Sequence, residues 1–444
     1  MKGAIVSLSQ RRNDHTEACL VVSDEHGSIF EIPDLQMAAS SAGSLVLPES
    51  SDIIPLPAAG VFFTMVKRHP VGFDPRTHEF VTISEYDGIP VYAVAAFMPP
   101  GYLQTLSCAY EELPGAPRLP LFCYSAAGWK NGKFYVAGYR IDRQMRQEIP
   151  DDALPDVDKK ARQLLKHHPN NRLIDHLVHK CVLTYRCPNA CNLALGRWEC
   201  PIPVSKVCNA ACIGCISQQP KSSCVPSTQH RLDFTPTVNE IANYVVPHLH
   251  SASLPIASFG QGCEGEPLLE ADLIEASIHA IRAKTERGVI NLNTNGSLPK
   301  SVERLCKAGL NSMRVSLNSA QHDYYNAYYR PKNYTFDDVV ESIRIAGSYG
   351  VWVSLNYLMF PGFTDHPSEM KALGKLLESG YVSMIQTRNL NIDPVWYIDS
   401  LKLNDYGNHA NGISRWVGEM RKNFPDVQLG YFNPTYAQVQ KKRT

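Results

Sequence analysis

From about residue 200 onward, the chain alternates short apolar runs with helical stretches. The apolar runs are 202–207, 256–260, 288–293, 312–317, 351–358 and 382–390, and helical stretches at 270–287, 301–308, 336–349 and 368–378 lie between them. Strands that alternate with helices of this length form right-handed βαβ units and a parallel sheet. Six such units predict an α/β fold, a partial (β/α)6 TIM-like barrel, whose functional residues gather at the carboxyl ends of its strands.

The first 150 residues have a different pattern. Short β segments at 4–8, 18–23, 28–32, 89–97 and 133–141 are broken by Gly, Pro and Asp, with predicted hairpin turns at 24–27 and 130–132. We therefore expect a smaller mainly-β domain at 1–150 and a helical, cysteine-containing linker at 151–200, with a helix at 155–168. The barrel would occupy 201–400, and a C-terminal helix and strand extension would occupy 401–444.

Charge and cysteine content narrow the classes of partner. The 43 basic and 43 acidic residues cancel, which argues against a nucleic acid or an anionic membrane as partner. We expect neither a secretory signal nor a membrane span, because the first residues carry early charges and no apolar run is long enough to cross a bilayer. The chain's 13 cysteines therefore predict metal ligation in a reducing cytoplasm, and no disulfides.

Three cysteines follow the first predicted strand in a C-x3-C-x2-C spacing: Cys208, Cys212 and Cys215. Three thiolates on one loop can hold three corners of a [4Fe-4S] cluster, and the fourth iron then keeps open positions for a small molecule. A zinc loop or three buried thiols would use the same residues, so the spacing alone leaves the choice open.

Short motifs with polar residues follow the other predicted strands. They are Gly265-Glu266-Pro267 after the second strand, Thr294-Asn295 after the third, Ser316 and Asn318 at the end of the fourth, Arg330 beyond it, and Asn356 on the fifth. Together with the cysteines, these motifs resemble those of the radical S-adenosylmethionine (SAM) superfamily, in the family's order, from 202 to 390. Two positions depart from the family pattern: Glu264 replaces the first glycine of its Gly-Gly-Glu-Pro motif, and Asn318 replaces an aspartate.

The resemblance implies an enzyme that reductively cleaves SAM at a [4Fe-4S] cluster held by the three cysteines, giving a 5′-deoxyadenosyl radical that acts on an unknown substrate. It implies an external reductant such as flavodoxin or ferredoxin. The motifs after the strands would contact SAM: Gly265, Glu266 and Pro267 at its amino group, Thr294 and Asn295 at its ribose, and Ser316, Asn318, Asn356 and Arg330 around the rest, with Arg330 pairing with the carboxylate.

Further cysteines lie just before the cluster loop. Cys181, Cys187, Cys191 and Cys200 are dense enough to suggest a second iron–sulfur cluster or a tetrahedral zinc site, although cysteines are also often simply buried. Cys263, beside Glu264, is expected near the cofactor. There it would donate a hydrogen atom, act as a ligand, or simply pack against its neighbours.

Two other functions fit the same sequence. An iron–sulfur redox or structural binding protein would have no SAM affinity. An RNA-modifying radical SAM enzyme would grip nucleic acid with its β domain, which would need a basic patch there. The sequence assigns no catalytic acid, base or radical relay.

Overall fold

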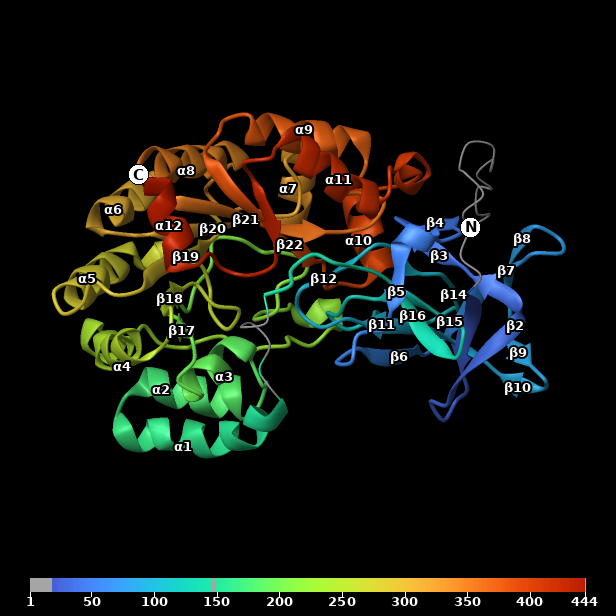
Figure 1. The fold of residues 1–444 in the computed structure, drawn as a ribbon, viewed down its shortest axis with the longest axis horizontal. Coiled ribbons are helices and arrows are strands. Elements are labelled where there is room, and N and C mark those ends of the chain that lie inside the picture. Colours follow the sequence, from blue (N-terminus) through green and yellow to red (C-terminus); the bar gives the residue numbers. More distant parts are fainter. Residues whose placement is uncertain (1–17, 145–148, 150, 444) are drawn as a thin grey trace.

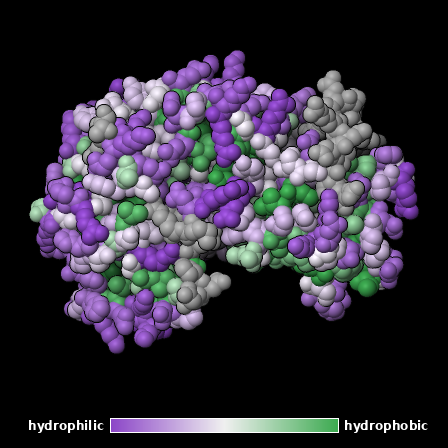
Figure 2. Space-filling model, in the orientation of Figure 1, coloured by the Kyte–Doolittle hydropathy of each residue, from purple (hydrophilic) through white to green (hydrophobic). Residues whose placement is uncertain are grey.

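The computed structural model describes residues 18–144, 149 and 151–443, so the β segment predicted at 4–8 lies outside the described residues. The described chain has three parts: a mainly-β region, a small helical segment and a parallel barrel (Figure 1). In Figure 2 a notch separates the helical segment from the β region at the lower edge of the molecule, and the face shown is largely hydrophilic.

The β region is built from short antiparallel strands, as its sequence pattern predicts. Between β15 and β16, Asn131 and Gly132 have φ values of +50° and +75°, which are the signature of the expected type I′ turn. The turn at 24–27 joins β1 to β2, as expected. The strands are β1 Cys19–Ser23, β2 Ile29–Met37, β3 Ala39–Ser41, β4 Ser44–Val46, β5 Ile53–Pro55, β6 Val61–Met65, β7 Arg68–Asp74, β8 Glu79–Thr82, β9 Glu85–Tyr86, β10 Ile89–Pro90, β11 Tyr92–Phe97, β12 Tyr102–Gln104, β13 Ser107–Cys108, β14 Tyr110–Glu112, β15 Ser125–Lys130 and β16 Lys133–Arg140.

The helical segment follows, and it includes the helix predicted at 155–168. Its elements are η3 Asp151–Asp156, α1 Val157–His167, α2 Arg172–His176, the π-helical turn η4 Leu177–Val182 and α3 Pro188–Ala194. Asn171 caps α2, because its side-chain oxygen accepts hydrogen bonds from the backbone N–H groups of Leu173 and Ile174.

The barrel confirms the expected fold class. Its parallel strands lie in chain order, and its helices pack around them (Figure 1). The strands are β17 Glu199–Ile202, β18 Ile256–Phe259, β19 Val289–Thr294, β20 Ser312–Leu317, β21 Trp352–Met359 and β22 Val382–Asn389, with β23 Gln428–Gly430 added at the edge. The helices are α4 Val238–Ser251, α5 Ala271–Arg282, α6 Pro299–Ala308, α7 His322–Tyr329, α8 Phe336–Ser348, α9 Pro367–Leu377, α10 Pro394–Leu401, α11 Ile413–Asn423 and α12 Tyr436–Arg443.

The first barrel strand differs from the prediction. The expected run 202–207 is wrong, because β17 spans Glu199–Ile202 and pairs with β18 from Glu199↔Ile256 to Ile202↔Phe259. Pro203 has no N–H to extend the pairing. The next two N–H groups, of Val204 and Ser205, donate to the Glu264 carboxylate at 2.7 and 2.8 Å. The residues beyond 202 therefore belong to a loop, which is buried at Val204 and Ser205 and exposed at Val207.

The β region docks against the carboxyl end of β22. Asn389 accepts from the Gln104 N–H at 2.8 Å and donates to the Tyr102 carbonyl at 2.9 Å, which joins β22 to β12. Nearby, the Leu119 N–H donates to Asp393 at 2.8 Å. The end of the barrel that carries the motifs is thus covered on one side by the β region.

Candidate functional site

The three cysteines of the spaced motif lie on the loop after β17, each half-buried. The backbone of this loop is fixed by α7: the Ala211 N–H donates to the Tyr329 carbonyl at 2.9 Å, and the Ile213 N–H donates to the Tyr328 carbonyl at 3.1 Å. Burial, with the Glu266 carboxylate nearby, raises the pKa of Cys208 to about 11. Such a thiol ionises readily only when a metal binds it, because coordination deprotonates the ligand.

Gly265 holds the second motif directly against the cysteine loop. Its N–H donates to the Ser205 carbonyl at 2.7 Å, and the Glu266 N–H donates to the Val207 carbonyl at 2.8 Å. A Cβ at position 265 would lie 1.8 Å from the Val207 oxygen, so only glycine fits this close backbone approach.

Glu264, which departs from the family pattern, has a structural role. Its carboxylate is only 4% exposed and accepts the N–H groups of Val204, Ser205 and Gln261, the last at 2.6 Å. Burial raises the pKa of Glu264 to about 8. The carboxylate therefore closes the base of the cysteine loop onto the loop after β18.

Glu266 connects the loops that follow β18 and β19. Its carboxylate accepts from the Leu268 and Asn295 N–H groups at 3.0 and 2.8 Å and from the Thr294 hydroxyl. Burial raises the pKa of Glu266 to about 7. The Asn295 side chain in turn donates to Asn209 of the cysteine loop at 2.8 Å. The structure thus brings Glu266, Thr294 and Asn295 together at the cysteine loop, beside Gly265 and the buried Pro267.

Ser316 and Asn356 lie in register on neighbouring strands, opposite Gln386 of β22. In β20 only Arg314 and Ser316 are partly exposed, while the alternate residues are buried. Because side chains on a strand alternate between its two faces, Arg314 and Ser316 face the barrel lumen. Arg314 donates to Gln386 at 2.9 Å, and burial, with Arg388 nearby, lowers the pKa of Arg314 to about 9.

Buried polar atoms without hydrogen-bond partners occur on these strands. Within the described residues they include Asn291 Oδ1, Arg314 Nε and Arg388 Nε, and also Asn318 Oδ1 just beyond β20. Most buried polar groups in proteins are satisfied, and such exceptions call for an explanation. A polar ligand in the lumen would supply the missing partners.

Asn318 and Arg330 lie differently from the other predicted contacts. The Asn318 amide donates to the Tyr324 carbonyl at 3.2 Å and to the Tyr397 hydroxyl at 3.3 Å, which ties it to α7 and α10. Arg330 is exposed and ends α7 with a φ of +49°. Two residues further on, the Lys332 N–H donates to the Asn209 carbonyl at 2.8 Å, so this turn contacts the cysteine loop.

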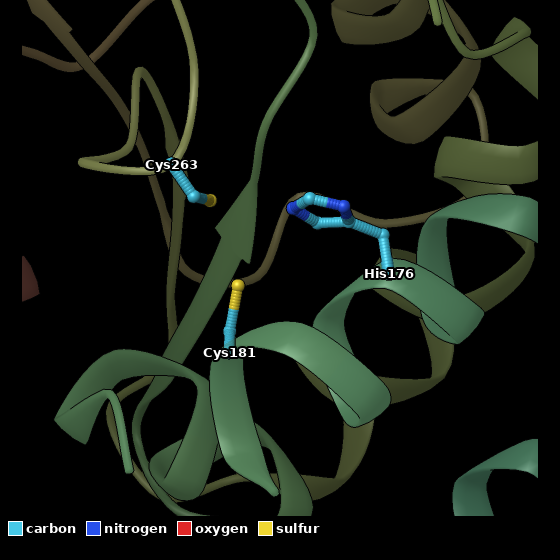
Figure 3. Close-up of side chains that lie close together, drawn as sticks. All are labelled: His176, Cys181 and Cys263. Atoms are coloured by element: carbon cyan, nitrogen blue, oxygen red, sulfur yellow. The ribbon is translucent and has the colours of Figure 1, made fainter. Parts of the chain in front are cut away.

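The expected second set of cysteines does not gather around a single point. In the part of the chain that the structure describes, the ligand group that comes together consists of His176, Cys181 and Cys263 (Figure 3). Cys200 is buried on β17 and Cys191 on α3, and neither joins this group. His176 was not predicted from the sequence, since no spacing rule links it to a residue 87 positions further along the chain.

Residues 202–373 match the family model of the radical SAM superfamily. GTP 3′,8-cyclase from Marinobacter nauticus is 28% identical over 159 residues, which are 35% of this chain and 42% of the relative, so the match spans about two fifths of that relative's length. A radical SAM methyltransferase from Sphaerobacter thermophilus covers 55% of this chain and 67% of its own at 15% identity and a TM-score of 0.36. The FeFe-hydrogenase maturase HydG from Carboxydothermus hydrogenoformans covers 68% and 72% at 13% identity and a TM-score of 0.36.

The fold and the site define a parallel barrel with a three-cysteine loop at the carboxyl ends of its strands. Over residues 202–373 the barrel matches the radical SAM superfamily, as its motifs predict. This match implies an iron–sulfur cluster and SAM as the groups that the barrel holds. No helix among the described residues is long and apolar enough to cross a membrane.

Proposed function

We propose that this chain reductively cleaves SAM at a [4Fe-4S] cluster held by Cys208, Cys212 and Cys215, and that the radical acts on a substrate in the barrel lumen. The observation that carries this proposal is the direct backbone pairing of Gly265 and Glu266 with the cysteine loop. It joins the ligands of the cluster to the motif expected at the SAM amino group.

The residues present fit both groups. Three half-buried thiols on one loop match the ligand number that leaves one iron open. The unpartnered polar atoms of the lumen match a polar ligand. When bound, the cluster would supply the electron that breaks the C5′–S bond of SAM, releasing methionine and the 5′-deoxyadenosyl radical.

The chain's own groups would position the reactants. Gly265, Glu266 and Pro267 would lie at the SAM amino group, Thr294 and Asn295 at its ribose, and Ser316 and Asn356 toward the lumen. Arg330 would have to fold over the cysteine loop to reach the carboxylate. The buried tyrosines of α7, Tyr325, Tyr328 and Tyr329, would exclude water from the cluster side of the loop.

The reaction needs one electron from outside the chain for each cleavage, and we propose flavodoxin or ferredoxin as its donor. We also propose the cytoplasm as its compartment, because a reducing environment keeps the thiols available for metal. All 13 cysteines are free in the structure, which is consistent with this proposal.

The test is 5′-deoxyadenosine formation by the anaerobically reconstituted protein with SAM and dithionite. The Cys208/Cys212/Cys215→Ala triple variant should form no product, whereas Cys224→Ala, which removes an exposed cysteine a few residues further on, should match the wild type. A wild-type protein with its full cluster that neither binds nor cleaves SAM would refute the proposal.

A further inference from the structure

A second group of metal-ligating side chains lies outside the cluster loop. His176 ends α2, Cys181 lies in the π-helical turn η4, and Cys263 lies in the loop after β18. Their ligand atoms all lie within 4.8 Å of one another, and Figure 3 shows the three side chains pointing toward one another. The residues are 8%, 1% and 4% exposed, so the group is enclosed by protein.

The histidine supplies an independent sign of a missing partner. His176 Nε2 is buried and has no hydrogen-bond partner within the described residues. A buried imidazole nitrogen left unpaired costs free energy unless something satisfies it. Neutral imidazole is the commonest metal ligand in proteins, and the two sulfurs beside it complete a typical set.

The backbone is shaped to bring His176 and Cys181 together. In an α-helix, residues five apart point about 140° away from each other. Here the Leu183 N–H donates to the Val178 carbonyl at 2.9 Å and the Tyr185 N–H donates to the Lys180 carbonyl at 3.1 Å, both i→i+5 bonds. This wider turn moves residues five apart toward one face. Single π turns are rare and are frequent at functional sites.

The spacing fits one ion. Ligands at about 2.0–2.3 Å from a tetrahedral zinc ion lie roughly 3.3–3.8 Å apart, which is compatible with the separation here. A cubane cluster instead binds each cysteine to a different iron, which would push the sulfurs further apart. Two thiolates and an imidazole are a zinc set that leaves a fourth position, as in Cys2His zinc sites.

We infer that His176, Cys181 and Cys263 bind a single zinc ion that fixes the helical segment to the loop carrying Glu264, Gly265 and Glu266. Cys263 directly precedes these residues, and its carbonyl accepts the Leu232 N–H at 2.8 Å. The ion would therefore join α2 and η4 to the loop after β18, and the hydrogen bond from Leu232 joins the chain that follows the cysteine loop to the same point. This site does not depend on the proposed SAM chemistry.

The experiment measures zinc in the full-length Cys208/Cys212/Cys215→Ala variant, in which the cluster ligands cannot bind it. About one zinc ion per chain is expected after dialysis. His176→Asn, Cys181→Ser and Cys263→Ser, each added to that background, should lower it at least tenfold. Cys200→Ser, a buried cysteine outside the group, should leave it unchanged.

Cobalt gives a second readout that does not depend on the stability of those variants. The triple variant, stripped with a chelator and loaded with Co²⁺, should show thiolate-to-cobalt charge transfer and tetrahedral visible bands, and loading should raise its melting temperature. A folded triple variant that binds neither metal would overturn the inference. So would zinc that persists when Cys181 and Cys263 are both replaced, or a Cys181–Cys263 disulfide in metal-free protein isolated without oxygen.

Discussion

Replacing Gly265 by alanine tests whether the backbone contact between the two motifs builds the cofactor site. The added Cβ would lie 1.8 Å from the Val207 oxygen and 2.4 Å from its carbonyl carbon. A carbon and an oxygen in contact are about 3.3 Å apart, so the cysteine loop must move by about 1.5 Å. The neighbours are backbone atoms, which cannot rotate away as a side chain does.

The size of the effect follows from the hydrogen bonds that this displacement breaks. They are the two bonds from the Gly265 and Glu266 N–H groups to the loop, worth about 1 kcal/mol each, and the displacement strains the chain further. We expect a loss of about 2–4 kcal/mol in the free energy of unfolding. Displacements of 1 Å at an active site cost on the order of 100-fold in rate, so SAM cleavage should fall by at least that factor.

The assay combines iron content, cluster absorbance and 5′-deoxyadenosine formation after anaerobic reconstitution. Gly262→Ala is the matched control, because a Cβ there would meet side-chain atoms of Ile216, Cδ1 at 2.7 Å and Cγ1 at 3.7 Å, and this side chain can rotate away. The control should load and cleave like the wild type. A Gly265→Ala protein with full iron and unchanged cleavage would show that the close approach is dispensable.

Three further predictions concern separate parts of the fold. Burial lowers the pKa of His248 to about 4 from 6.5, so the unfolded chain binds a proton below pH 6.5 that the folded chain rejects. The free energy of unfolding, measured by urea titration, should therefore fall by up to about 3 kcal/mol as the pH drops from 6.5 to 4. His248→Gln should reduce this dependence on pH, and His250→Gln, at an exposed position, is the control that should keep it. Asn389→Ala removes both hydrogen bonds between β22 and β12 and should lower the unfolding free energy by about 1–3 kcal/mol, seen as a lower urea midpoint with wild-type iron content. Glu264→Gln places a side-chain N–H₂ group opposite one of the backbone N–H donors at the base of the cysteine loop, so that two donors face each other. The variant should bind less iron when iron is limiting, while its circular dichroism spectrum, which reports secondary structure, stays unchanged.

The barrel was predictable because its signals are local. Apolar runs mark the strands from β18 onward and a 3.6-residue period marks several of the helices between them, and β20 runs over the expected residues, 312–317. Helix α4 was not among the predicted helices, although Thr237 and Glu240 form a capping box, the Thr-x-x-Glu signal of a helix start. The resemblance to the radical SAM family was likewise visible in the sequence, because all three cysteine ligands lie on one loop at a recognisable spacing.

The features that could not be predicted from the sequence depend on contacts between distant segments. The apolar run after Ile202 reads as a strand, yet its N–H groups are satisfied by the Glu264 carboxylate, 60 residues away from Val204. The same contact explains why Glu264 stands where the family motif Gly-Gly-Glu-Pro has its first glycine. The grouping of Cys263 with His176 likewise needs the tertiary fold, and a π turn that no sequence period predicts.

Residues 264, 265 and 266 perform three different tasks in three consecutive positions: a buried acceptor, a position with no room for a side chain, and a connector of two loops. Each of the three residues must consequently stay at its own position in the loop. Deleting or inserting one residue here would put a glutamate where only glycine fits and leave three backbone donors facing the wrong side chain. Length variation among related chains should therefore stop short of this tripeptide and accumulate in the loops on either side of it.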